Sequence, residues 1–170
     1  MSISVENLKA NLTNPARVYM WDVVIPSPVG GGDSNTLMLR CQSTNMPGRS
    51  VGNIAVPYKQ SAGIQFMGKL TYSHTWECTF IEGEDANVFS AFYDWAQSQI
   101  NDRDNIGIGD NLIKTDIILR LVTTKGSEYL SIKLIGCYVD SMADVPLAYD
   151  TEDPVRLTVT FRYDRWEKVT

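Results

Sequence analysis

The sequence predicts a mainly β domain, an antiparallel β-sandwich or barrel-like fold with one flanking α-helix. Three observations carry this prediction. Residues 68–81 and 154–166 alternate between apolar and polar side chains, the period of a strand with one buried face. Residues 115–136 have the pattern of a hairpin that turns at Lys125-Gly126-Ser127. Residues 82–101 carry the one long run of apolar side chains at helical spacing.

The chain begins with an arm, residues 1–16, in which Val5, Leu8 and Leu12 can share one face of a helical turn or two before Pro15 ends the pattern. A strand over residues 18–26 then places alternate residues on one face: Tyr19, Trp21, Val23 and Ile25. Two glycine-rich loops are expected, over residues 27–35 and 101–111. Neither interrupts the single domain, residues 1–170.

The later strands define the expected core. The apolar face of residues 68–81 comprises Leu70, Tyr72, His74, Trp76, Cys78 and Phe80, and its polar face comprises Thr71, Ser73, Thr75, Glu77 and Thr79. The closing strand places on one face Val155, Leu157, Val159, Phe161 and Tyr163. We therefore expect the core to contain Trp76, Phe80, Phe92, Trp95, Val159 and Phe161.

The single predicted helix spans residues 82–101. Asp85 is its candidate N-cap, and Glu82 and Glu84 suit the positive end of the helix dipole. The apolar stripe consists of Val88, Phe89, Phe92, Trp95, Ala96 and Ile100. This stripe predicts that the helix packs against a sheet or across the end of a barrel.

The chain length, the net charge and the cysteines restrict the classes of function that the protein can have. The 170 residues fit one domain, and the net charge of −5 disfavours stable nucleic-acid binding, which depends on clustered lysines and arginines. The N-terminal residues lack the pattern of a signal peptide, so we expect a soluble protein made in a cytoplasm. Cys41, Cys78 and Cys137 lack metal or redox spacing and are expected to be reduced apolar residues.

No pattern of catalytic or metal-binding residues is found. His74 is the only histidine and is expected at a satisfied core or boundary position. Residues 102–113 resemble a calcium loop at their acidic first and third positions but have Ile106 and Ile113 where ligands are needed. Gly107-Ile108-Gly109 follows a helix and lacks a third glycine, unlike a nucleotide fingerprint. We expect no enzymatic activity, no cofactor and no metal.

The segment Pro47–Gly68 is too apolar for a solvated loop and too rich in breakers for an ordinary strand. Its glycines and prolines are interleaved with apolar side chains, and its local charge is +2, from Arg49 and Lys59, in a chain whose remainder is −7. We interpret residues 46–68 as an extended contact loop or hairpin that orders against neighbouring subunits. A long hairpin within one barrel is the alternative.

Charge is unevenly distributed along the chain. Residues 34–76 contain no acid and carry four bases, Arg40, Arg49, Lys59 and Lys69, whereas residues 82–110 contain seven acids and one arginine. A chain that docks one face onto a different face of its own copy gains register from such a pattern. Scattered surface charge without a partner is the alternative.

Short segments along nearly the whole chain resemble the tail tube proteins of T-even-type contractile-tailed bacteriophages. The resemblance is carried by Pro15-Ala16-Arg17, Val24-Ile25-Pro26, Met46-Pro47-Gly48-Arg49, Val56-Pro57-Tyr58-Lys59, Phe66-Met67-Gly68, Trp76, Thr79-Phe80-Ile81, Phe92, Trp95, Ile100-Asn101 and Phe161-Arg162-Tyr163-Asp164-Arg165-Trp166. Their order and spacing together match the family more closely than any one segment does.

The resemblance implies a fold shared with type VI secretion tube proteins and a structural role in the virion tail, assembled in the cytoplasm of a host bacterium. Subunits would form hexameric rings that stack into a hollow tube. The implied partners are further copies of the chain, the tail sheath protein, the tape-measure protein, the baseplate tube initiator and the tail terminator. DNA would pass through without stable binding.

Two sets of residues are predicted to serve assembly and transport. The subunit or ring contacts are Arg49, Val51, Ile54, Val56, Pro57, Tyr58, Lys59, Phe66 and Met67, and the residues lining the lumen are Thr71, Ser73, Thr75, Glu77 and Thr79. Three other functions are open: the inner tube of a related contractile injection system, a monomeric β-barrel that binds a small ligand, and a hydrolase that uses carboxylates without a distinctive spacing.

Overall fold

Strands dominate the chain, as the alternating patterns predict. The computed structural model describes residues 4–12, 14–26, 33–101, 103–104, 106–107, 109 and 113–169. The helices are α1 (Val5–Asn11), α2 (Ser34–Arg40) and α3 (Asn87–Gln99). The strands are β1 (Trp21–Val24), β2 (Cys41–Thr44), β3 (Arg49–Tyr58), β4 (Ser61–Tyr72), β5 (Thr75–Ile81), β6 (Thr115–Val122), β7 (Glu128–Met142), β8 (Arg156–Arg162) and β9 (Arg165–Val169). Among these residues, no helix has both the length and the apolar character needed to span a bilayer.

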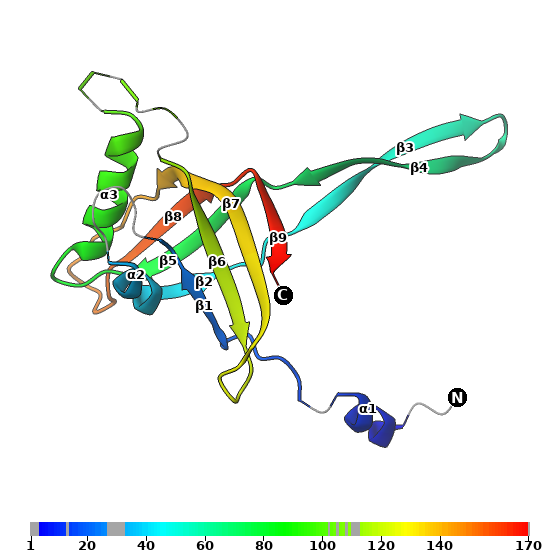
Figure 1. Cartoon of the computed structure of the whole chain (residues 1–170), viewed down its shortest axis with the longest axis horizontal. Helices are drawn as coiled ribbons and strands as arrows, with labels where there is room; N and C mark the ends of the chain where they lie inside the picture. Colours follow the sequence, from blue (N-terminus) through cyan, green and yellow to red (C-terminus); the bar gives the residue numbers. More distant parts are fainter. Residues whose placement is uncertain are drawn as a thin grey trace.

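Seven strands form one antiparallel sheet in the order β1-β6-β7-β8-β5-β2, with β9 beside β7 (Figure 1). The long strand β7 pairs with β6 and β9 in its first part and with β8 in its last part. Between these parts lies Gly136, with a φ of 70° that favours glycine. Because β7 belongs to both layers, the sheet folds over onto itself, which confirms the predicted β-sandwich or barrel-like fold.

The core lies between the two layers and under α3. All six predicted core residues are buried. The Phe161 ring lies at its centre, with centroid distances of 5.8 Å to Trp76, 5.7 Å to Phe92 and 5.9 Å to Trp95. The alternation of β5 and β8 therefore predicted the buried face correctly from Trp76 and Leu157 onward.

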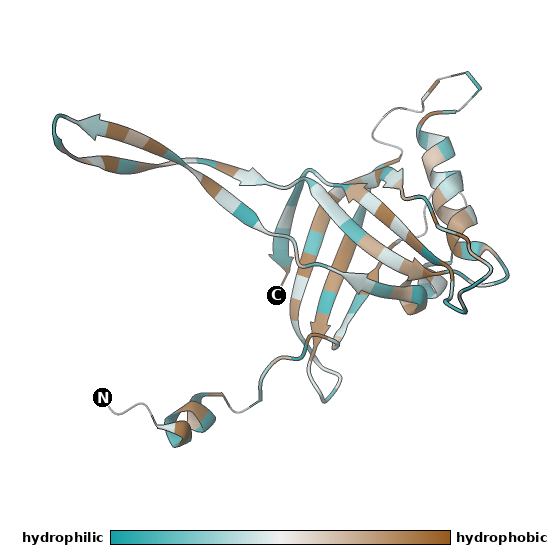
Figure 2. Ribbon diagram, turned by 180° about the vertical axis from the view of Figure 1, so that it is seen from behind, coloured by the Kyte–Doolittle hydropathy of each residue, from teal (hydrophilic) through white to brown (hydrophobic). Residues whose placement is uncertain are grey.

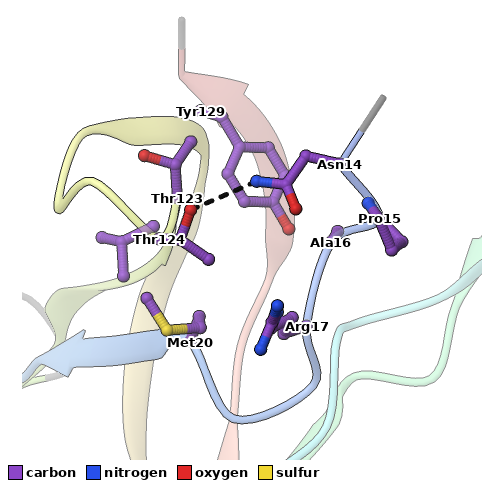
Figure 3. Close-up of a pocket in the computed structure, with 9 residues that line it drawn as sticks. Asn14, Pro15, Ala16, Arg17, Met20, Thr123, Thr124 and Tyr129 are labelled. Atoms are coloured by element: carbon purple, nitrogen blue, oxygen red, sulfur yellow. Dashed lines mark hydrogen bonds between the residues drawn. The ribbon is translucent and has the colours of Figure 1, made fainter. Parts of the chain in front are cut away.

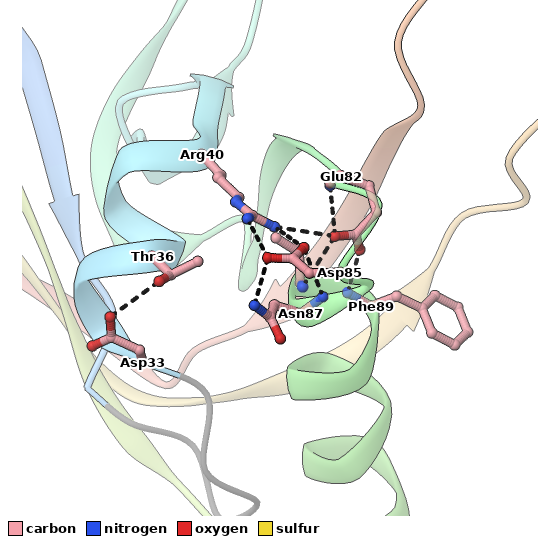
Figure 4. Close-up of polar contacts among 9 residues, drawn as sticks. Asp33, Thr36, Arg40, Glu82, Asp85, Asn87 and Phe89 are labelled. Atoms are coloured by element: carbon pink, nitrogen blue, oxygen red, sulfur yellow. Dashed lines mark hydrogen bonds and ion pairs between the residues drawn. The ribbon is translucent and has the colours of Figure 1, made fainter.

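The helix α3 is shorter than predicted and begins differently. Its N-cap is Ala86, with a φ of 51°, so the prediction of Asp85 as N-cap is wrong. The Glu82 carboxylate instead accepts hydrogen bonds from the backbone N–H groups of Val88 and Phe89 (Figure 4). Phe89 and Ile100, which were assigned to the apolar stripe, are exposed, and Ala91 is buried in their place.

The strand predicted over residues 68–81 is broken at Ser73 and His74. His74 has a φ of 56° and lies outside both β4 and β5. The prediction that it lies on the buried face is wrong, because its side chain is exposed, with Nδ1 3.1 Å from the carbonyl oxygen of Tyr163. The polypeptide changes direction here, so β4 leaves the main sheet while β5 stays within it.

The first predicted strand is also shorter, because β1 covers only Trp21–Val24. Val23 and Ile25 are buried, whereas Tyr19 is exposed and does not extend the apolar face. The helix α2, which no pattern predicted, follows and is capped by Asp33, whose side chain accepts a hydrogen bond from Asn35. Residues 27–32 of the predicted glycine-rich loop lie outside the described residues.

The N-terminal arm contains the predicted helical turns as α1, and Val5 and Leu8 of this helix are exposed, as is its C-cap, Leu12. The arm then passes over the turn between β6 and β7, where Asn14 donates a hydrogen bond of 3.2 Å to Thr124 (Figure 3). A pocket of about 130 Å³ lies beneath this segment, beside Met20 and Tyr129. The pocket is small, and nothing in its lining indicates a ligand.

Candidate assembly surface

The strands β3 and β4 pair only with each other and form a hairpin that projects from the body of the molecule (Figure 1). The pairing runs from Arg49 opposite Tyr72 to Tyr58 opposite Ser61. Every residue of β3 is exposed. Residues 46–68 therefore include a free-standing hairpin, and the alternative of a hairpin within the barrel sheet is not observed.

The glycines of the hairpin lie where the two backbones approach most closely. A Cβ atom on Gly68 would lie 2.8 Å from the carbonyl carbon of Gly52, and one on Gly63 would lie 2.8 Å from the carbonyl oxygen of Val56. The strand register shifts between Val51 and Asn53, which marks a bulge beside the Gly52–Gly68 contact. The glycines let the two backbones approach closely and twist, which explains why a paired hairpin contains so many of them.

One face of the outer hairpin is apolar. The ribbon coloured by hydropathy has apolar positions along both strands of the outer hairpin (Figure 2). Ile54 lies opposite Phe66, and each residue is about half exposed. Val56 lies opposite Ile64, two positions nearer the tip. On the other face Asn53 donates a hydrogen bond to Gln65, and Met67 is 87% exposed. A two-stranded hairpin alone is marginally stable in water, so an apolar face of this kind is typical of a surface that a partner covers.

The hairpin also carries free positive charge. Arg49, Lys59 and Lys69 form no ion pair with any described residue. The Lys59 ammonium lies 5.7 Å from the centroid of the Tyr58 ring. These three bases remain available to an acidic partner.

Arg40, the fourth base of the acid-free segment, is used within the chain. Its guanidinium lies 2.6 Å from Asp85 and 3.4 Å from Glu82 (Figure 4). The hydrogen bond from Arg40 lowers the pKa of Asp85 to about 2. The prediction that the charge pattern serves contacts between copies is therefore wrong for Arg40, which links α2 to the start of α3.

Two tryptophans hold the base of the hairpin. The indole of Trp166 donates a hydrogen bond of 3.1 Å to the Gly48 carbonyl, and that of Trp76 donates one of 2.6 Å to the Asn45 carbonyl. The Tyr72 ring packs edge-on against Trp166. The alternation assigned Trp76 to the core but did not predict these contacts, because they join positions more than 30 residues apart.

The predicted lumen residues do not form one continuous surface. Thr71 belongs to the hairpin, opposite Ser50, and Ser73 lies at the break, 3.0 Å from the Tyr163 hydroxyl. The other three lie on the outer face of β5: Thr75, Glu77 and Thr79, opposite Arg162, Thr160 and Thr158 of β8. The structure brings these three together on a polar face and separates the first two from it.

The three cysteines are free. Cys78 and Cys137 are buried, and burial raises the pKa of each thiol, that of Cys137 to about 12. Both behave as small apolar residues at neutral pH. Within the described part of the chain, no group of three or more His, Cys, Asp or Glu residues could hold a metal ion. The segment 102–113, which we do not expect to bind calcium, lies partly outside the described residues, since residues 102, 105, 108 and 110–112 are not described.

The fold is shared with chains from contractile injection systems. A chain from the tube-terminating cap of the anti-feeding prophage aligns with a TM-score of 0.69, 14% identity and coverage of 100% of this chain and 96% of that one. A chain from the extended sheath–tube complex of the extracellular contractile injection system PVC aligns with a TM-score of 0.68, 16% identity and coverage of 99% of each chain. A chain from the PVC sheath/tube terminator aligns with a TM-score of 0.69, 15% identity and coverage of 92% and 98%.

The profile of the phage tail tube protein family matches residues 11–169, and the chain belongs to this family. A search of curated protein sequences found no match. Membership confirms the resemblance predicted from the sequence and makes the chain a structural component of a phage or phage-like tail.

Proposed function

We propose that the chain forms hexameric rings that stack into the inner tube of a contractile tail and conduct the genome during ejection. The observation that carries this proposal is the free-standing hairpin β3–β4, whose apolar face and three unpaired bases are exposed. A monomer gains nothing from exposing such a surface, whereas a neighbouring copy can cover it. A tube of a related contractile injection system would use the same contacts and is the alternative within this proposal.

The relatives support the choice of partners. The aligned chains come from a sheath–tube complex, a tube-terminating cap, a sheath/tube terminator and a baseplate. We therefore propose contacts with a sheath protein, a tail terminator and a baseplate tube initiator, and a tape-measure protein inside the tube. Residues 1–16 and 46–68 would act as the arm and the contact hairpin of a single domain.

A conduit must surround DNA without binding it. A ring of six such chains would carry a net charge of about −30, which repels phosphates if the lumen has the same sign. We propose that the outer face of β5, with Thr75, Glu77 and Thr79, contributes to this lumen. Its threonine hydroxyls and carboxylate offer no counterion-release affinity that would retain the DNA.

A ligand-binding barrel is not favoured, because aromatic side chains fill the centre between the layers, and the cavity of about 380 Å³ beside Trp21, Leu119 and Leu121 is open to solvent and mainly apolar. Trp76, Phe92, Trp95 and Phe161 are all buried there. A binding barrel would instead enclose a cavity with a few polar groups directed into it.

Imaging of the purified protein tests the proposal directly. Size-exclusion chromatography and negative-stain microscopy should show rings or stacked cylinders whose amount rises with protein concentration. Particles that remain single domains at every concentration would contradict a tube-forming function. The same images would show whether the ring contains six subunits.

The lumen assignment predicts an effect of reversing one charge. Replacing Glu77 by Lys should leave tubes intact but slow genome ejection, because it changes the charge of a six-membered ring by about +12 and attracts phosphates. Infection kinetics of phage that carry the variant tube measure this. Glu6→Lys, the same charge change on the exposed helix α1, is the control, and ejection at the normal rate with Glu77→Lys would rule out the assignment.

A further inference from the structure

The loop between β7 and β8, residues 143–155, exposes both apolar and acidic side chains. Leu147 is 82% exposed and Tyr149 is fully exposed. Asp144, Asp150, Glu152 and Asp153 are exposed as well, and none forms an ion pair with a described residue. We call residues 143–155 the acidic loop.

The acidic loop is fixed at both of its ends. The Ala143 N–H donates a hydrogen bond of 2.9 Å to the Thr158 carbonyl, and the Glu82 N–H donates one of 2.9 Å to the Val155 carbonyl. Val145 packs against the core. The loop is thus held beside the start of α3, at the end of the molecule opposite the hairpin (Figures 1 and 2).

We propose that the acidic loop is the surface on which the β3–β4 hairpin of a second copy docks. The inference rests on the proposed function, since it names the partner surface of the same hairpin. Charge complementarity supports it: the hairpin presents Arg49, Lys59 and Lys69, and the loop presents four carboxylates. The exposed Leu147 and Tyr149 supply apolar surface to match the hairpin face that contains Ile54 and Phe66.

The positions of the two surfaces determine the kind of assembly. Because they lie at opposite ends of the molecule, the contact is head-to-tail and leaves one free hairpin and one free loop after each addition. A symmetric dimer through two hairpins would oppose like charges, three bases against three, and one through two loops would oppose four acids. The charges therefore select rings or filaments over closed pairs.

Mixing two charge-reversed variants tests this pairing. The hairpin variant Lys59→Glu/Lys69→Glu and the loop variant Asp150→Lys/Glu152→Lys should each lose about tenfold or more of the sedimentable assemblies. A 1:1 mixture should recover them, because the reversed, acidic hairpin of the first variant meets the reversed, basic loop of the second, and the normal hairpin of the second meets the normal loop of the first. Circular dichroism confirms that each variant is folded, and Glu6→Lys/Glu128→Lys, at two exposed positions outside the hairpin, the acidic loop and residues 82–110, is the matched control, which should assemble as the wild type does.

The outcomes separate this inference from the proposed function. If the loop variant assembles normally while the hairpin variant does not, the hairpin docks elsewhere and only the inference is overturned. If the two variants are folded but form no assemblies either alone or as a mixture, the pairing of the hairpin with the acidic loop is also overturned. If the wild-type chain forms no rings or tubes at all, the proposed function and the inference fail together.

Discussion

Replacing Ile54 and Phe66 together by serine should leave a folded monomer that no longer forms tubes. The two side chains lie opposite each other on the apolar face of the hairpin, and each is about half exposed. Full burial of such a side chain is worth about 1.5–3 kcal/mol, so covering the exposed halves of both contributes about 1.5–3 kcal/mol to each contact. Sedimentation and negative-stain microscopy measure the loss of tubes. This loss should be large, because the missing contact energy is repeated at every subunit of a ring.

The hairpin itself supplies the control for this experiment. Ala55 and Gln65 form the adjacent register pair on the other face. Serine at both of these positions changes the same two strands without removing the apolar face, and such a variant should still assemble. Tubes of normal length from the Ile54→Ser/Phe66→Ser variant would show that the apolar face does not hold subunits together.

The strands were predictable where the alternation of side chains coincides with pairing in the main sheet. The strands β5 and β8 follow their predicted faces from Trp76 and Leu157 onward, because one face of each packs on the core, and β6 and β7 form the predicted hairpin, which turns between Val122 and Glu128. The break at Ser73 and His74 was not predictable in this way. Alternation continues in phase through Tyr72, His74 and Trp76, and only the change of pairing partner shows that the strand ends there.

Composition predicted part of the candidate assembly surface. The hairpin was detected because glycines and apolar residues occur together without acids. The acidic loop also places prolines, Pro146 and Pro154, beside apolar side chains that are exposed, Leu147 and Tyr149. It was not detected because it lies outside the two segments with an excess of one charge, residues 34–76 and 82–110. Counting charges along a chain also does not distinguish a pair within a subunit from one between subunits, as Arg40 and Asp85 demonstrate.

Replacing Phe161 by alanine should destabilise the domain by about 3–5 kcal/mol, the usual cost of removing a buried aromatic side chain. Phe161 is fully buried, and its ring contacts those of Trp76, Phe92 and Trp95, so the cavity would open between both layers and α3. A domain of this size has about 5–15 kcal/mol of stability in total. The melting temperature should fall by about 10 °C or more.

Assembly would mask this loss, because subunits that bind only in the folded state raise the apparent stability. Urea and thermal unfolding should therefore be measured in the Ile54→Ser/Phe66→Ser background, where the chain is expected to be monomeric. Thr160→Ala, next to Phe161 on the outer face of β8, is the matched control and should change the free energy of unfolding by less than about 1 kcal/mol. An equally small effect of Phe161→Ala would mean that the aromatic cluster does not hold α3 on the sheet. The body of the domain, which presents the hairpin and the acidic loop at opposite ends, would then need another source of stability.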